Sequence, residues 1–69
     1  MTQNEIIIRH LKTFGRITPV EAMNEYGIMR LASRIHDLKQ EGYRISSENK
    51  VSINRFGEKV HYASYRLVS

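Results

Sequence analysis

The sequence has no cysteine and no tryptophan, and its 69 residues include one proline and four glycines. Without cysteine the chain forms no disulfide and offers no thiolate to a metal, which favours the reducing cytosol as its compartment. No apolar run approaches the roughly 20 residues of a membrane-spanning helix, and residues 1–5 lack the basic region of a signal peptide. We therefore expect a cytoplasmic protein without a membrane partner.

Motifs that carry catalytic chemistry are also missing. The three histidines, His10, His36 and His61, lie far apart in sequence and lack carboxylate neighbours at metal-ligand spacing. No glycine-rich phosphate loop and no nucleophile motif is present. We expect each histidine to be a surface or hairpin residue, and the sequence predicts a protein that is not an enzyme and uses no cofactor.

The chain does have an unevenly distributed positive charge, with a net value of +4 at pH 7. Residues 1–29 hold three basic and three acidic side chains, whereas residues 30–69 hold eight basic and four acidic ones. The whole excess therefore lies in the later segment, which favours a polyanionic partner. A soluble basic protein with no such partner would have the same total charge.

The N-terminal segment carries the signals of a capped helix. Thr2 and Glu5 fit a capping box, and Gly15 is suited to a left-handed C-terminal cap. This pattern predicts a helix over about 3–14, with apolar side chains at helical spacing at Ile7, Ile8, Leu11 and Phe14.

A second helix start is stronger, because it adds a proline at the first helical position. Thr18, Pro19 and Glu21 together predict a helix over about 19–26, which Gly27 ends. We expect its inward-facing side chains to be Val20, Met23 and Tyr26.

A third helix is predicted over about 29–41, after Ile28 fills the corner and before Gly42 ends it. On a helical wheel the side chains of Leu31, Ile35 and Leu38 form one apolar stripe. Arg34 lies on the flank, close to Arg30 and within reach of Asp37. Opposite the stripe lie Met29, Arg30, Ser33, His36, Asp37 and Gln40.

Two arginines on this helix have the chemistry of DNA readout. Arg30 and Arg34 can each donate paired hydrogen bonds to guanine in the major groove, and Ser33 is short enough to allow a close approach. An ordinary solvated helix face, with an ion pair between Arg34 and Asp37, would have the same sequence.

After residue 42 the apolar pattern changes to period two. It predicts strands over about 43–54 and 59–68, joined near 55–58, with a bulge or bend at 46–49 and a very short third strand at Ile17. The resulting fold class is α+β. A three-helix cluster followed by a β-hairpin wing makes residues 1–69 a single winged helix-turn-helix domain.

Further candidate contacts lie outside the third helix. The wing carries Lys50, Arg55 and Lys59, whose cations suit a phosphate backbone or a minor groove. Phe56 either wedges against a base step or folds back on its own hairpin. Thr18 and the first amides of the second helix form a possible phosphate site, although Thr18 can also act as a cap alone.

The runs ITPVEA (17–22), YGIMRLASRIHDL (26–38), EGYRI (41–45) and YASYRLV (62–68) resemble small winged helix-turn-helix proteins that are common in bacteriophages and prophages. The resemblance covers nearly the whole chain and implies a DNA-binding domain. The older bacterial helix-turn-helix pattern does not align with this sequence. Its apolar positions fall about two residues away from Leu31, Ile35 and Leu38, so our candidate residues come from the helical wheel.

The leading hypothesis is a sequence-specific binder of double-stranded DNA, either a phage regulator of transcription or an excisionase-like architectural factor. A palindromic site would require a homodimer, formed through the Ile6 edge of the first helix or the late hairpin. An alternative is a protein-interaction module that inhibits a host enzyme or defence complex. A third possibility is binding of RNA or single strands, with Tyr62 available for stacking.

Overall fold

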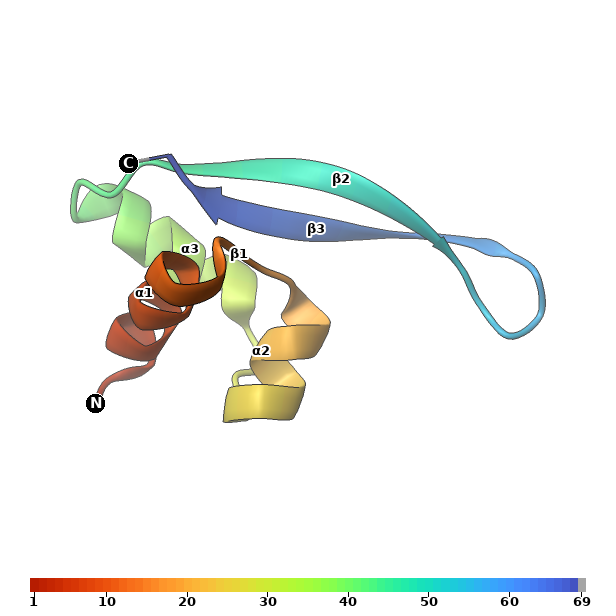
Figure 1. The fold of residues 1–69 in the computed structure, drawn as a ribbon, viewed down its shortest axis with the longest axis horizontal. Helices are drawn as coiled ribbons and strands as arrows, with labels where there is room; N and C mark the ends of the chain where they lie inside the picture. The colour runs from red at the N-terminus through yellow and green to blue at the C-terminus, as the bar shows by residue number, and fades with distance from the viewer. Residues whose placement is uncertain (69) are drawn as a thin grey trace.

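The computed structural model describes residues 1–68 and contains three helices and a three-stranded antiparallel sheet (Figure 1). The fold is therefore α+β, as the sequence predicted. In chain order the elements are α1 (Gln3–Phe14), β1 (Arg16–Ile17), α2 (Pro19–Tyr26), α3 (Leu31–Gln40), β2 (Ile45–Ile53) and β3 (Lys59–Leu67).

Local signals explain where the first two helices begin and end. Thr2 with Glu5, and Thr18 with Glu21, each form the expected capping box. In both pairs the hydroxyl accepts the glutamate N–H, and the glutamate side chain accepts the N–H of the threonine. Gly15 closes α1 with a φ of 90°, a left-handed conformation that favours glycine. The predicted bounds of α1 and α2 are confirmed.

The third helix is shorter than predicted, since it runs from Leu31 to Gln40 rather than over 29–41. Arg30 has a φ of −121° and a ψ of 62°, outside the helical region, and makes no side-chain cap hydrogen bond. Met29 and Arg30 therefore belong to the turn that follows α2, and α3 is about 15 Å long.

The sheet has the strand order β1-β3-β2, with β3 in the centre at its inner end. The very short strand predicted at Ile17 is present as the two residues of β1, and Ile17 pairs with Tyr65 of β3. Strands β2 and β3 pair over nine consecutive positions from Ile45↔Leu67 to Ile53↔Lys59. The bulge predicted at 46–49 is wrong, because these four polar residues keep regular partners on β3, from Ser46↔Arg66 to Asn49↔Ala63.

A small apolar core joins the helices to the inner end of the sheet. Its buried members come from the three helices, from β1 and β2, and from the turn before α3: Ile7, Ile8, Leu11, Ile17, Ala22, Ile28, Leu31, Ile35, Leu38 and Ile45. The stripe predicted for the third helix is confirmed, since Leu31, Ile35 and Leu38 are each 2% exposed. Burial of this stripe fixes which face of α3 meets solvent.

The predictions for the inward side of α2 are wrong. Val20 is 63% exposed, Met23 and Tyr26 are also exposed, and Ala22 is the one buried residue of this helix. A helix of eight residues with a methyl group at its contact point lies close to its neighbours, which leaves the larger apolar side chains at the edges. Phe14, expected on the apolar side of α1, is likewise exposed.

His10 differs most from its predicted surface position, because it is buried at 5% exposure. Its Nδ1 lies 2.7 Å from the hydroxyl of Tyr26, and its ring contacts those of Phe14 and Tyr26. The histidine therefore joins α1 to the end of α2.

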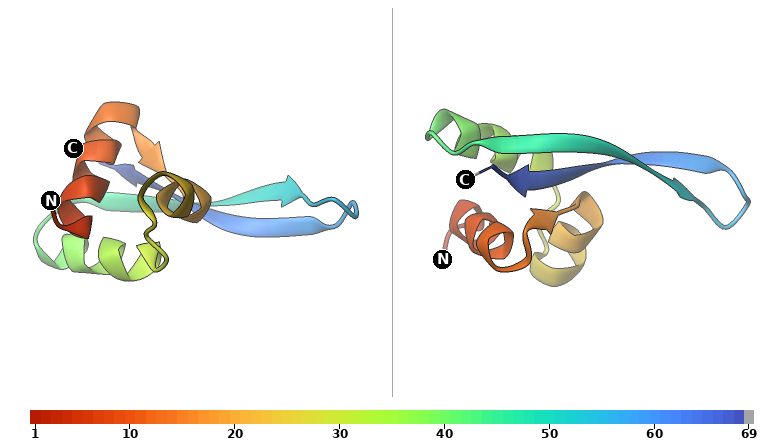
Figure 2. Two further views of the ribbon diagram at one scale, coloured as in Figure 1. Left: turned by 90° about the horizontal axis from the view of Figure 1, so that it is seen from below. Right: turned by 45° about the horizontal axis from the view of Figure 1, so that its top comes forward.

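The β2–β3 hairpin is the wing, and its outer half projects beyond the helices (Figures 1 and 2). The molecule measures 39 × 22 × 20 Å, and the wing accounts for its long dimension. Strands β2 and β3 lie inside the predicted ranges of 43–54 and 59–68. Only the inner end of the hairpin packs on the core, where Ile45 is buried and Tyr65 and Leu67 lie against it.

Candidate nucleic-acid interface

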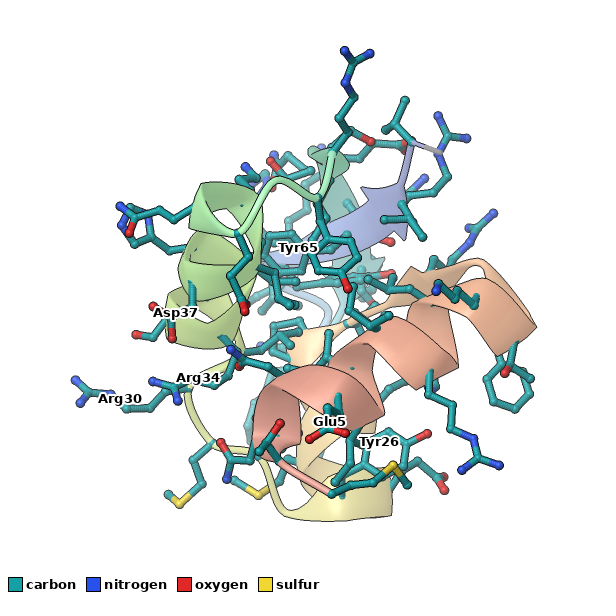
Figure 3. The ribbon with its side chains drawn as sticks, turned by 90° about the vertical axis from the view of Figure 1, so that its left-hand side faces the viewer. Glu5, Tyr26, Arg30, Arg34, Asp37 and Tyr65 are labelled. Carbon is teal, nitrogen blue, oxygen red and sulfur yellow. The ribbon has the colours of Figure 1, made fainter. Side chains whose placement is uncertain are left out.

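The polar face of α3 is anchored by the buried stripe on its other side. Arg30 and Ser33 are exposed, and Arg30 extends away from the helices (Figure 3). The structure therefore brings together three of the candidate residues, Arg30, Ser33 and Arg34, along one turn at the start of α3.

Arg34 has a partner within its own helix. Its guanidinium nitrogen lies 3.5 Å from a carboxylate oxygen of Asp37, and both side chains are partly exposed. At this exposure an ion pair contributes little free energy because water screens it. The pair holds Arg34 beside the polar face, and a duplex can displace it at low cost.

The start of α3 differs electrostatically from the other two helix starts. Glu5 and Glu21 place carboxylates against the first amides of α1 and α2, whereas α3 has no acidic residue in its first turn and no side-chain cap. Its N-terminal partial positive charge therefore adds to the charge of Arg30.

The three predicted wing cations occupy two different environments. Arg55 lies in the loop of the wing and Lys59 begins β3 beside it, and both side chains are exposed. Lys50 lies midway along β2, where its Nζ is 2.9 Å from the carboxylate of Glu48. The hydrogen bond that Lys50 donates is the main cause that lowers the pKa of Glu48, and the positive charge of Lys50 lowers this pKa further. Much of the charge of Lys50 is therefore compensated within the strand.

Thr18 is fully engaged as a cap. Its hydroxyl accepts the N–H of Glu21 at 3.3 Å and lies 3.2 Å from the Glu21 carboxylate, to which it donates. Thr18 also lines a shallow hollow between α2 and the wing, together with Val20, Ser52, Val60 and Tyr62. A phosphate approaching Thr18 would have to displace or face a carboxylate, which weakens this candidate.

The outer face of the sheet holds a pair of cations that the sequence analysis did not select. Arg16 of β1 lies directly opposite Arg66 of β3, and like charges in this position repel. Both arginines also contribute to the lowered pKa of Glu48. The period-two pattern already placed Arg66 opposite the apolar side of its strand, but the register that adds Arg16 is a tertiary feature.

Within residues 1–68 no group of three or more His, Cys, Asp or Glu side chains is placed to hold a metal ion. In the same part of the chain no helix is long and apolar enough to cross a membrane.

The fold and the site indicate the winged-helix class of proteins, which combines three helices with a long antiparallel hairpin and a basic polar face on the third helix. A family model described as a winged helix-turn-helix domain matches residues 2–69, and the chain belongs to this family. No curated protein and no solved structure matches the chain. Membership supports DNA binding as the general function.

Proposed function

We propose that the protein binds double-stranded DNA in a sequence-dependent way, with α3 in the major groove and the wing on the flanking backbone. The observation that carries this proposal is the exposure of Arg30 and Ser33 at the start of α3, with Arg34 partly exposed on the flank of the same turn, while the opposite face of the helix is buried. A helix held in this way can enter a groove about 12 Å wide without disturbing the core.

The two arginines and the serine have different roles in this proposal. Arg30 and Arg34 donate paired hydrogen bonds to the O6 and N7 atoms of guanine, and Ser33 allows the helix backbone to approach the base edges. On binding, Arg34 exchanges the carboxylate of Asp37 for a base, whereas Arg30 has no such partner to give up. Arg30 therefore makes the larger contribution to base preference.

The remaining candidates contact the phosphate backbone. Arg55 and Lys59 supply exposed charge at the far end of the wing, so they bind phosphates of any sequence. Lys50 and Thr18 contribute less, because Lys50 is already paired with Glu48 and the Thr18 hydroxyl is already hydrogen-bonded to Glu21. These contacts fix the orientation of α3 in the groove.

We further propose that residues 1–69 act as one domain in the cytoplasm of a phage-infected or prophage-carrying cell. A regulator of transcription and an excisionase-like architectural factor both fit this surface. A palindromic target would require two copies of the chain, one on each half-site.

The proposal is tested by selecting, from a pool of random duplex DNA, the sequences that the protein binds. The size of the resulting protein–DNA complex is then measured. We expect enrichment of a site that contains guanines, and a competing single-stranded oligonucleotide should not remove the protein from it. Failure to enrich any motif, or a preference for the single strand, would contradict major-groove reading.

The surface of α2 favours a second candidate function, binding to a host protein. Val20, Met23 and Tyr26 are all exposed on this short helix, although a surface helix normally buries such side chains. Replacing Met23 with serine should then abolish inhibition of a host enzyme or defence complex while leaving duplex binding intact. Loss of duplex binding in this variant would assign the surface to DNA instead.

A further inference from the structure

The wing ends in an aromatic side chain that the fold leaves in solvent. Phe56 is 82% exposed, more than any other large hydrophobic residue among residues 1–68. It does not fold back on the hairpin, which was one of the two alternatives the sequence left open. Exposure of a whole phenylalanine ring is unfavourable in water, so contact with a partner there gains free energy.

The backbone that carries Phe56 is held in one conformation. The Oδ1 atom of Asn54 accepts the N–H groups of Phe56 and Glu58, each at 2.9 Å. Backbone hydrogen bonds between Asn54 and Glu58, and from Gly57 to Asn54, close the same loop. Gly57 has a φ of 78°, which a side chain would strain. The ring is therefore presented by an ordered turn, which lowers the entropy lost on binding.

The surroundings of the ring suit a DNA groove. Arg55 precedes it and Lys59 follows the loop, while the carboxylate of Glu58 lies toward the amide of Asn54. Further along the wing, Val51 and Ile53 are 52% and 60% exposed. The cross-strand partners of Val51 and Ile53 are His61 and Lys59. A single apolar ring with cations on either side matches a minor groove, where basic side chains are attracted and apolar side chains insert between base steps.

The length of the wing provides the reach. Each of its strands has nine residues, which is about 30 Å of extended chain, and only the inner end contacts the core. Figures 1 and 2 show the loop well away from all three helices. The loop can therefore meet a part of the duplex that α3 does not touch.

We propose that Phe56 inserts between neighbouring base pairs from the minor groove and kinks the duplex that α3 binds. This inference rests on the proposed function. The chain would then shape its DNA target as well as read it, and the flexible pyrimidine–purine steps would be favoured at the insertion point because they unstack most easily.

The test compares Phe56→Ala with Phe14→Ala, which removes another exposed ring, 68% against 82% exposed, at the end of α1. The probe is the duplex recovered by selection, labelled at both ends for energy transfer and carrying 2-aminopurine at successive positions. The wild-type protein and Phe14→Ala should bend it by about 20–90° and unstack one position. Phe56→Ala should lose the bend and the fluorescence rise, and bind about fivefold to tenfold more weakly.

A conservative variant and a folding control complete the design. Phe56→Leu keeps an apolar wedge and should retain most of the bend, while thermal unfolding of both Phe56 variants should match the wild type. If Phe56→Ala bends and unstacks the duplex as the wild type does, insertion is wrong although the proposed function stands. If the wild-type protein binds no duplex at all, the proposed function itself fails.

Discussion

Individual side chains determine how α3 can contact a DNA duplex. Arg30 is exposed at the start of the helix, whereas Arg34 shares its charge with Asp37 at 3.5 Å. The helical wheel predicted Arg30 opposite the apolar stripe and Arg34 on the flank of the helix. Arg34 lies within α3 beside Asp37, but Arg30 precedes the helix, so helix geometry alone does not fix its position. The exposure of Phe56 and the burial of His10 depend on long-range packing, and the sequence alone did not predict them.

Removal of one arginine at a time separates base contacts from phosphate contacts. Arg30→Ala and Arg34→Ala should each weaken binding to the selected site by about 1–3 kcal/mol and relax base preference there. Lys59→Ala should weaken all sequences to a similar extent, because it removes only a phosphate contact. Fluorescence anisotropy with selected and shuffled duplexes measures both effects. Uniform weakening by the arginine variants would place those side chains on the backbone.

The capping box of α1 predicts a pH dependence of folding stability. Hydrogen bonds from the backbone and side chain of Thr2 lower the pKa of Glu5 below its ordinary value. Since the folded pKa is the lower one, this stabilisation is present above the unfolded pKa, about 4.3, and is lost as the pH falls through the folded value.

Glu5→Gln should therefore lower the thermal midpoint at pH 7, and the difference from the wild type should disappear as the pH falls through the folded pKa of Glu5. Glu25→Gln, at an exposed glutamate near the end of α2, is the matched control and should have a much smaller effect. Calorimetry at several pH values measures both variants. A difference that persists in strong acid would show that Glu5 acts through something other than its charge.

At the level of whole elements, boundaries were predicted better than orientations. The bounds of α1 and α2 follow from local signals, such as the capping boxes and glycine caps, that act within a few residues. The inward face of α2 was mispredicted because a helix of eight residues has too few turns for its apolar pattern to select one side. Residues 46–49 pair regularly because the nine-pair register of the wing aligns them with β3. The sequence of these four residues gives no local sign of that pairing.

The start of α2 offers a test of the role of Thr18. Thr18→Ala removes the hydroxyl that caps the Glu21 N–H, and should lower the free energy of unfolding by about 0.5–2 kcal/mol. If Thr18 is a cap alone, duplex affinity measured well below the unfolding temperature should stay within about twofold of wild type. A loss of affinity much larger than this would assign a phosphate contact to this helix start.

At the level of the whole molecule, the fold distributes the candidate residues over four places. Arg30, Ser33 and Arg34 lie together on α3, Arg55 and Lys59 lie at the far end of the wing, and Thr18 and Lys50 lie apart from both. The sequence predicted the fold class and the residue types, but the separation of these places is set by the length and direction of the wing. The proposed interface therefore spans the molecule.

The dependence of duplex binding on salt tests the central claim most directly. Each phosphate contact made by a cation should contribute about −0.9 to the slope of log K against log salt, so the contacts of Arg55, Lys59 and Lys50 give a slope of about −2 to −3. We expect measurable binding to duplex DNA at about 50 mM salt and a steep decline toward 200 mM. No measurable duplex binding by the folded protein at about 50 mM salt would contradict the account.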